Sequence, residues 1–475
     1  MKKREFMVVM LLTALMLALL TACSEPAGPS QSESSEASAQ ESEAMTVKEY
    51  VRSIADGKYY EDTTFTIVSV ATFNTEYMPM YFEVSEYNDE PFNDAAYERN
   101  LLLEELLGVQ VVFSGAGNSG TELPDMVKNA INSNTHEYDL IVPHSYYGVV
   151  SLMTDGMLYD WYDVPFVDFT KDWWLESALD DLSVAGKTVW AVGDLTIGYQ
   201  TPAWMLFNRD MAEEYGKEEL YRTVLDGNWT LDVMCEYVKD VSSASGEGEK
   251  VGAQFPEALL KAFMNSTNTY PSGKDSSGAL AFEPSVSRIS ELCTKLSTIV
   301  TGGDAEVVPY DSEKYTDFIN GKTLMLLFNG GHYETMRNID FNVGIVPLPK
   351  LDENQDDYIS LGGGGIMAIP IDTPDIEFAG LVTQALNALS SDSVRPAFYE
   401  TVLYNKCLKD DDSQKMMDII LETQQYVNVV NVSEIEALIP TVYKDGAVQS
   451  YIDKYSQSIK SQYADITSGV IESNK

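Results

Sequence analysis

The stretch at 199–210 constrains the fold of this 475-residue chain more than any other segment. Pro202 makes the residues before it extended or turning, and the apolar run at 204–207 is short enough for a buried strand. Asn208 is typical of a helix N-cap, and Asp210 places an acid in the first turn that follows. A strand that passes straight into a capped helix, after a long α/β pattern, indicates that the chain crosses here from one lobe into another.

Strand and helix patterns alternate with short connections before this stretch. The pattern predicts strands at 64–72, 109–113 and 138–143, with helices at 93–107, capped by Asn93, and at 122–132. Such alternation favours βαβ units and a largely parallel sheet, in which ligands bind beyond the carboxyl ends of the strands. The first and third strands deliver these candidate ligand-binding residues to that edge: Asn74, Tyr77, His144, Tyr146 and Tyr147.

The first residues have the pattern of an export signal that ends in a lipid anchor. Three basic residues at 2–4 precede an almost wholly apolar run at 6–20, which is too short for a comfortable membrane span. Leu-Thr-Ala-Cys at 20–23 matches the bacterial lipobox. This resemblance implies a lipoprotein signal peptide at 1–22 and a lipid on the sulfur of Cys23. An uncleaved anchor and an ordinary secretory signal are the alternatives.

The residues after Cys23 predict a tether. The segment 24–44 has seven Ser, five Glu and no aromatic, Lys or Arg residue, so it cannot bury enough apolar surface to order itself. As a flexible coil it would span about 25 Å root-mean-square. We therefore interpret 23–62 as a lipid-anchored, Ser/Glu-rich tether and lead-in. Together with the lipobox resemblance, it implies a location on the extracellular face of a cell membrane, and we expect a bacterium of Gram-positive type. The tether indicates no activity.

Composition excludes several classes of partner. The formal net charge of −43 argues against nucleic acid and against electrostatic docking on anionic lipid. Of the four cysteines, Cys235, Cys293 and Cys407 are isolated, so neither a disulfide framework nor a zinc site is indicated. We expect no metal and no cofactor. The chain that follows the signal and tether segments is long and apolar enough for at least two domains.

Two further parts of the chain carry a family resemblance. Asp-Trp-Tyr-Asp-Val-Pro at 160–165, the Trp pair at 173–174 and a Gly-Lys strand at 185–190 precede the crossover stretch. Later, a buried strand at 321–331 ends in Asn-Gly, and a short helix and Gly-Ile-Val-Pro-Leu-Pro at 344–349 follow it. This order resembles the extracellular solute-binding proteins, family 1-like and of lipoprotein type, that serve bacterial ABC sugar importers.

The resemblance implies an α/β, two-lobe periplasmic-binding-protein-like fold of type II, with three hinge crossovers and a ligand cleft between the lobes. We expect lobe 1 to comprise 63–203 with 330–361, and lobe 2 to comprise 204–329 with 362–475. Four glycines at 362–365 are not a P-loop, because no helix opens there and no Lys-Ser or Lys-Thr follows. The resemblance makes them a flexible hinge strand beside the ligand.

Aromatic residues near the crossovers have two interpretations. Their faces can stack on sugar rings, or they can pack in the core, which we favour for four of them: Trp161, Trp173, Trp174 and Trp190. Both interpretations stay open for Trp204, which follows Pro202 at the mouth of the crossover. The resemblance and the crossover positions add five candidate ligand-binding residues: Thr201, Trp204, His332, Tyr333 and Gly363.

These features predict a substrate-binding lipoprotein of an ABC transporter. It would be a monomer that captures a small extracellular solute, a carbohydrate or oligosaccharide, and delivers it to the permease subunits in the membrane. The chain has three histidines and no HExxH, GxSxG or Walker motif, so we expect no enzyme. A surface-tethered polysaccharide hydrolase remains an alternative, because acids are numerous enough for a chance carboxylate pair. A ligand sensor for a membrane histidine kinase is another.

Overall fold

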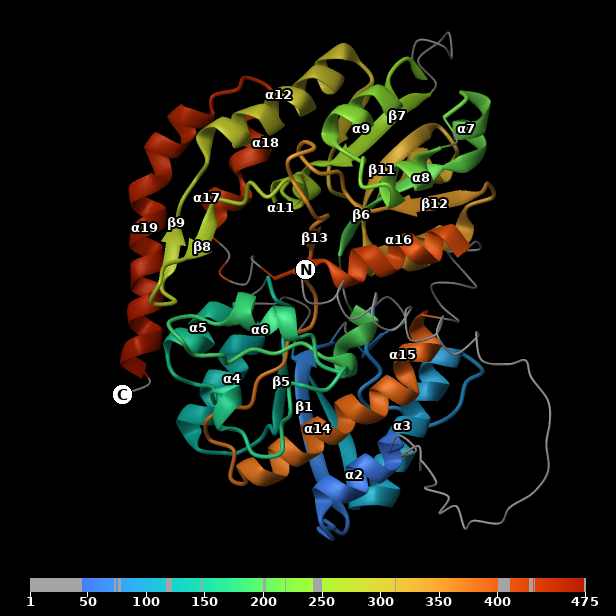
Figure 1. Ribbon diagram of the computed structural model, residues 1–475. Coiled ribbons are helices and arrows are strands. Elements are labelled where there is room, and N and C mark those ends of the chain that lie inside the picture. The colour runs from blue at the N-terminus through green and yellow to red at the C-terminus, as the bar shows by residue number, and fades with distance from the viewer. Residues whose placement is uncertain are drawn as a thin grey trace, which may run out of the picture. The chain divides into compact units, whose positions relative to one another are not determined.

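Two β-sheets organise the part of the chain that the computed structural model describes (Figure 1). The described residues are 45–71, 74–75, 78–116, 122–146, 148–199, 202–217, 219–241, 250–311, 313–399, 411–426, 430 and 432–473. The segment from Thr46 onward clusters as one compact unit. The signal segment at 1–22, Cys23 and the tether at 24–44 lie outside the described residues, whereas the rest of the predicted lead-in, 45–62, is described.

The first sheet has three parallel strands in the order β4-β1-β5. They are β1 (Thr63–Val70), β4 (Val109–Ala116) and β5 (Leu140–Val142), so the three strands predicted before the crossover are confirmed. Helix α3 (Pro91–Leu107) links β1 to β4, and α4 (Glu122–Ser133) links β4 to β5. The βαβ pattern read from the sequence therefore forms the predicted parallel sheet.

The start of α3 differs from the sequence-based prediction. The helix begins at Pro91, with Glu90 at the N-cap, and Asn93 lies inside the first turn. Proline suits the first helical position, because its φ is already helical and its missing N–H has no helical partner there. The Asn93 side chain donates instead to the carbonyl of Glu86 at 3.1 Å. Asn93 as a cap was therefore wrong.

The second sheet has five strands in the order β10-β7-β11-β6-β12. Its strands are β6 (Ala203–Asn208), β7 (Val251–Pro256), β10 (Ala305–Val308), β11 (Thr323–Asn329) and β12 (Val343–Val346). The crossover strand β6 lies between β11 and β12 and runs antiparallel to both. All its residues are buried, which fits the short apolar run seen in the sequence.

The predicted cap at the end of β6 is confirmed. The Asn208 side chain accepts a hydrogen bond of 2.9 Å from the N–H of Met211, in α7 (Arg209–Glu214). The bond satisfies one of the free donors at the start of the helix. The strand therefore passes directly into the helix, as its sequence predicts.

The lobe assignment made from the sequence needs correction around the glycine run. We placed 330–361 in lobe 1, but β12 pairs with β6 in the second sheet. We placed 362–475 in lobe 2, but 365–370 forms bridges to the first sheet's side, among them Ile141 with Ala368 and Ala191 with Met367. Helix α14 (Ile376–Asp392) then packs on α3. From here, lobe 1 denotes the elements around the first sheet and lobe 2 those around the second.

Among the described elements, those before and after three points along the chain lie on different sheets, so the chain passes between the sheets at these points. It passes first between η3 (Asp194–Tyr199) and β6, and next between β13 (Ser360–Leu361) and Gly365. The third passage falls between α15 (Val394–Pro396) and α16 (Asp411–Glu422). Part of that passage, 400–410, lies outside the described residues.

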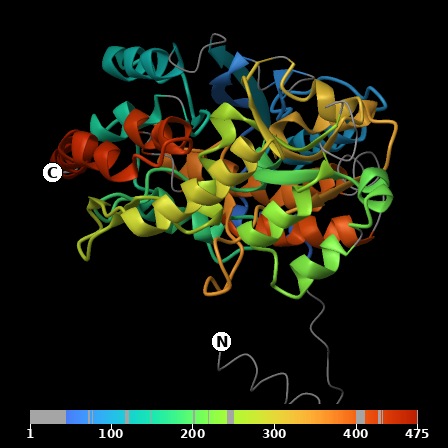
Figure 2. The same ribbon diagram turned by 90° about the horizontal axis from the view of Figure 1, so that it is seen from above.

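The remaining elements cover the sheets or connect them. Figure 2 shows α19 beside α12, in agreement with their packing. Within the described ranges, no helix combines the length and apolar character needed to cross a membrane. These elements are α2 (Val47–Ala55), β2 (Asn74–Thr75), β3 (Met78–Pro79), α5 (Val149–Thr154), η2 (Trp161–Asp163), α6 (Glu176–Leu182), α8 (Leu220–Leu225), α9 (Leu231–Val238), η4 (Glu257–Leu259), α11 (Ala262–Ser266), β8 (Ser272–Lys274), β9 (Leu280–Phe282), α12 (Val286–Gly302), α13 (Thr316–Ile319), η5 (Gly330–Asn338), β14 (Gln424–Gln425), α17 (Ser433–Glu436), α18 (Leu438–Val442) and α19 (Val448–Ser473).

Candidate functional site

Residues of the two lobes meet at the Lys261 ammonium. Lys261 stands just before α11, and its Nζ lies 4.3 Å from the ring centroid of Tyr146, which follows β5 in lobe 1. Lys261 also pairs with the carboxylate of Glu436 at the end of α17. The Lys261 and Glu436 side chains are 16% and 17% exposed, so little water screens the pair. An aromatic face, an ammonium and a carboxylate thus share one place between the lobes.

Backbone contacts with the glycine run hold Tyr146 in position. The N–H of Ser145 donates to the Gly364 carbonyl at 2.8 Å, and the Gly364 N–H donates to Ser145 Oγ at 3.2 Å. Gly364 has φ of +119°, a conformation that side chains rarely allow. At Gly365, a Cβ would lie 2.9 Å from Met80 Cε. Glycine is therefore required at Gly364 by its backbone conformation and at Gly365 by the close approach of Met80. The run also lies at a passage between the sheets.

His144 holds Tyr146 in place through a hydrogen bond and a ring contact. Its Nδ1 accepts the Tyr146 N–H at 3.1 Å, and the two rings lie 5.1 Å apart. Burial, and to a smaller extent the Lys261 charge, lowers the pKa of His144 to about 3. The imidazole is therefore neutral at physiological pH, with its proton on Nε2. His144, predicted from the sequence to bind ligand, is 7% exposed and acts here as a support for its neighbour.

We expect the wild type to lose stability relative to a His144→Asn variant as the pH falls from 7 to 5. The unfolded imidazole takes up a proton near pH 6.5, whereas the folded one stays neutral down to about pH 3. The stability linked to His144 is therefore fully present above pH 6.5 and is lost as the pH falls toward 3, by at most about 1.4 kcal/mol per pH unit.

Urea unfolding of both proteins at several pH values measures this difference. Asparagine keeps an acceptor for the Tyr146 N–H, so the variant is a matched control for the hydrogen bond. A difference in unfolding free energy that stays constant with pH would show that His144 titrates alike in the folded and unfolded states.

A second polar and aromatic group lies in lobe 2, at the end of β11. Tyr310 Oη lies 3.3 Å from His332 Nε2, and the Tyr315 and His332 rings are 5.7 Å apart. The Lys314 ammonium stands 4.6 Å from the Tyr310 ring centroid and 4.8 Å from that of Tyr315. Burial, then the charge of Lys314, lowers the pKa of His332 to about 4. Tyr310, 41% exposed, leaves ring surface open to solvent.

Several residues of these two groups were missed from the sequence. Lys261 and Glu436 are separated by 175 positions and stand in ordinary amphipathic segments. Tyr310 and Lys314 precede the buried strand predicted at 321–331 and match no motif. No local signal distinguishes them, because their position beside the predicted residues is set by tertiary packing.

Other predicted site residues are only partly described. The backbone of Asn74 belongs to β2 and that of Tyr333 to η5, while their side chains are not described. Gly363 is buried and lies in the second passage, between β13 and Gly365. Among the described residues, no group of three or more His, Cys, Asp or Glu side chains is placed to hold a metal ion. Three predicted residues lie outside the described residues: Tyr77, Tyr147 and Thr201.

Trp204 is a core residue in this structure. Its side chain is 2% exposed, and its ring lies 5.7 Å from that of Phe328 on the neighbouring strand. A Cβ on Gly330 would come within 2.4 Å of the indole Cζ3 atom, so the ring lies directly over the Gly330 backbone. No face of the indole is left for a sugar. Of the two interpretations left open by the sequence, burial supports core packing.

The tryptophans of the 161–190 region are also buried. The expectation that all four pack in the core is confirmed, since each is at most 6% exposed. Trp173 and Trp174 border a cavity of about 620 Å³ next to α16, together with the Asp194–Arg395 ion pair at 3.0 Å. Burial raises the pKa of Asp194 to about 7, while Arg395 opposes the shift.

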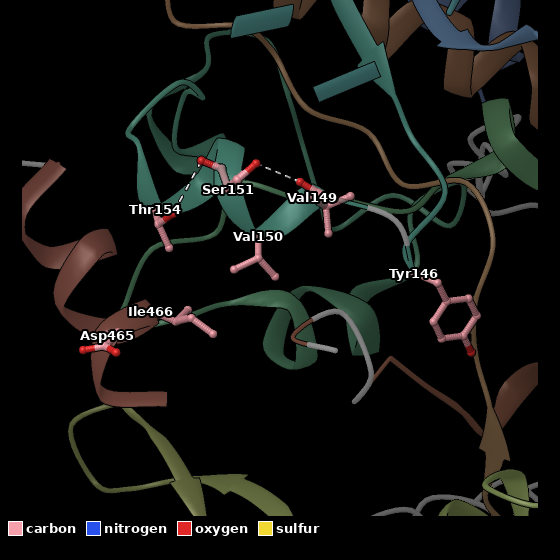
Figure 3. A pocket seen from close by; sticks show the side chains of 8 residues that line it. Tyr146, Val149, Val150, Ser151, Thr154, Asp465 and Ile466 are labelled. Carbon is pink, nitrogen blue, oxygen red and sulfur yellow. Dashed lines mark hydrogen bonds between the residues drawn. The ribbon is translucent and has the colours of Figure 1, made fainter. Parts of the chain in front are cut away.

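Another cavity, of about 490 Å³, extends from Tyr146 between α5 and α19. Figure 3 shows Val150 on α5 and Ile466 on α19 extending into it, with Tyr146 at the other side of the space. The Ser151 hydroxyl donates to the carbonyl of Gly148, just before α5, and the Thr154 hydroxyl donates to the carbonyl of Ser151. The walls are therefore mainly apolar, and the cavity adjoins the place where Lys261 and Tyr146 meet.

Comparison with known proteins supports the fold. No family model matches the sequence, and no curated protein matches it. The structure resembles that of UgpB from Mycobacterium tuberculosis in complex with glycerophosphocholine, with a TM-score of 0.56 and 15% identity over 81% of this chain and 98% of that chain. It also resembles a cyclo/maltodextrin-binding protein complexed with maltotetraose, with a TM-score of 0.57 and 13% identity over 88% and 98%.

These similarities define the class of fold. The chain has the α/β, two-lobe fold of type II periplasmic binding proteins. Both similar structures hold a small molecule, glycerophosphocholine in one and maltotetraose in the other. At 13–15% identity the similarity supports the fold alone. The ligand has to be inferred from the residues of this chain.

Proposed function

We propose that this chain is the substrate-binding lipoprotein of an ABC transporter. It captures an extracellular solute and delivers it to permease subunits in the membrane. The observation that carries the proposal is the meeting of both lobes at Tyr146, Lys261 and Glu436, within a fold that binds solutes between its lobes. A site built from two lobes encloses its ligand when they close, as importer receptors require.

The proposed ligand is a carbohydrate or oligosaccharide. The partly exposed rings of Tyr146 and Tyr310 suit the C–H faces of sugar rings, while Lys261, Glu436 and His332 supply donors and acceptors for hydroxyl groups. The similar structures carry maltotetraose and glycerophosphocholine, which are both rich in hydrogen-bonding oxygen. The chemistry of this site supports a polyhydroxylated ligand.

The proposal includes an anchored monomer on the extracellular face of the membrane. The lipobox that ends at Cys23 and the Ser/Glu-rich tether support it. Mass spectrometry of the protein from a bacterial host would detect the lipid on Cys23. A Cys23→Ser variant should then be released from the membrane fraction, and retention of that variant would contradict the anchor.

A ligand panel with two readouts tests the function. We would incubate residues 24–475 with maltodextrins, cellodextrins, xylo-oligosaccharides and glycerophosphocholine, then record melting temperature and reaction products. A ligand at 100 times its Kd stabilises a pure binder by about 2.7 kcal/mol, and the sugar is recovered unchanged. Cleavage of an oligosaccharide would contradict the receptor and support the surface hydrolase instead. Growth of a deletion strain on the identified solute separates an importer from a sensor.

Tyr146→Ala should weaken binding of the ligand found in that panel about tenfold to a hundredfold, which corresponds to about 1–3 kcal/mol. The ring is only partly buried, so the melting temperature without ligand should change little. Calorimetric titration measures the affinity. Tyr162→Ala is the matched control. Tyr162 lies in the same lobe, is 66% exposed, and its ring packs against Phe169. Equal affinities of the two variants would remove Tyr146 from the site.

A further inference from the structure

The hairpin β8–β9 (272–282) and the long helix α19 (448–473) form one unit, which we call the strap. The N–H of Leu280 donates to Thr467 Oγ1 at 3.3 Å, and the hydroxyls of Ser272 and Tyr463 share a hydrogen bond. Figure 1 shows the hairpin beside α19, and the two elements are in close contact along β9. Helix α19 also packs on α12 and α18 of lobe 2 and on α5 of lobe 1, so the strap connects the two lobes.

The tip of the hairpin touches lobe 1. The carbonyl of Gly278 accepts a hydrogen bond of 2.8 Å from the N–H of Ala185. The Lys274 ammonium donates to Ser183 Oγ at 3.1 Å and to the carbonyl of Asp180. Because Asp180 and Ser183 lie in and after α6, these bonds join the strap to lobe 1 at a place separate from the three chain passages.

The C-terminal end of α19 also touches lobe 1, at α5. A Cβ on Gly469 would lie 2.8 Å from Thr154 Cβ, and one on Gly156 would lie 2.6 Å from Ser473 Cβ. Such distances are below ordinary van der Waals contact, so this approach of α19 to α5 requires glycine at both positions. The apolar cavity of Figure 3 lies between the same two helices.

We propose that the strap is a releasable latch that holds the two lobes together. Among the described residues, its contacts with lobe 1 include a backbone hydrogen bond and a lysine at the hairpin tip, together with the packing of α19 on α5, where two glycines allow close approach. None of them involves a strand of either sheet, so releasing them leaves the strand pairing of both sheets intact. The three passages allow the lobes to rotate, and the strap resists that rotation until its tip and helix end detach. Opening for solute exchange therefore requires release of the strap from α5 and α6.

Substitution at the helix end tests the latch without any ligand. Gly469→Val should force α19 away from Thr154 and increase the radius of gyration measured by small-angle scattering. Hydrogen exchange at the Ala185 amide should become about tenfold faster, because opening frees its bond to Gly278. Ser468→Val is the matched control, since Ser468 is the exposed neighbour of Gly469. A Gly469→Val protein with wild-type radius and exchange would overturn the proposal.

Substitution at the hairpin tip tests the other end. Lys274→Ala should also speed exchange at Ala185, whereas Lys460→Ala, on the exposed side of α19, should not. A cooperative thermal melt for each variant shows that the cores remain folded. Wild-type exchange in Lys274→Ala would overturn the role of the tip. Neither measurement uses a solute, so the result does not depend on the proposed transport function.

A covalent lock provides an independent measurement. A Thr154→Cys, Gly469→Cys pair, in a Cys407→Ser background, should form a disulfide after a shift of about 1 Å, because the β-carbons already lie close together. Cys235 and Cys293 should not interfere, since burial raises the pKa of their thiols to about 11 and about 12. The oxidised protein should keep Ala185 protected even with Lys274→Ala added. Failure of the cross-link to form would show that α19 does not contact α5 in solution, and would overturn the proposal.

Discussion

Trp204→Ala should lower the free energy of unfolding by about 3–5 kcal/mol, the cost typical of removing a large aromatic side chain from a core. The indole is 2% exposed, lies beside Phe328 and covers Gly330, so truncation leaves a cavity that two strands and a turn cannot easily fill. Urea unfolding followed by circular dichroism measures the change. Tyr162→Ala, at a side chain that is 66% exposed, should change stability by less than about 0.5 kcal/mol.

The same variant separates the two roles that the sequence left open for Trp204. If Trp204 is a core residue, the folded fraction of the Trp204→Ala protein should bind its ligand with near-normal affinity. A near-native unfolding free energy together with a large loss of affinity would contradict core packing, and would return Trp204 to the ligand site.

Arg99→Ala should cost about 3–5 kcal/mol of stability. Arg99 is 1% exposed, and its guanidinium donates to the carbonyls of Tyr81 at 2.7 Å and Phe82 at 3.2 Å. Removal leaves a cavity and two carbonyl groups without this donor. Burial lowers the pKa of Arg99 to about 9, so the group is still charged at pH 7, and relief of its desolvation offsets part of the cost.

Thermal and urea unfolding of Arg99→Ala measure this effect. Arg52→Ala is the control, because Arg52 is 55% exposed and its ion pair with Glu105 is long, at 3.5 Å. Removal of the Arg52 side chain should change the free energy of unfolding by less than about 0.5 kcal/mol. An Arg99→Ala protein as stable as Arg52→Ala would show that the segment after β3 does not depend on the buried guanidinium.

Local structure was largely predictable from the sequence, because it depends on neighbouring residues. The apolar run before Asn208 predicted a buried strand, and the asparagine predicted the cap that the structure shows at Met211. The alternation before the crossover predicted the parallel order around β1. His144 and Tyr146 were found because a parallel sheet brings the ends of its strands to one edge.

Assignment of segments to lobes was not predictable in the same way. The strand at 343–346 and the segment at 365–370 are both short and apolar, and each could complete either sheet. Only the hydrogen bonds of β12 to β6, and the bridges of Met367 and Ala368 to lobe 1, decide their places. Backbone pairing between distant segments leaves no mark in local composition, so the lobe boundary drawn from the sequence was misplaced.

Local sequence patterns predicted the main elements, the crossover strand and the His144 and Tyr146 part of the candidate site. Tertiary structure alone decided that Lys261 and Glu436 join Tyr146, because their ion pair links segments 175 residues apart. It also decided that Trp204 is buried, since Phe328 and Gly330 come from another strand and the turn that follows it. Periodicity shows which residues are apolar, but exposure depends on what packs against them, and that is fixed only when distant strands pair.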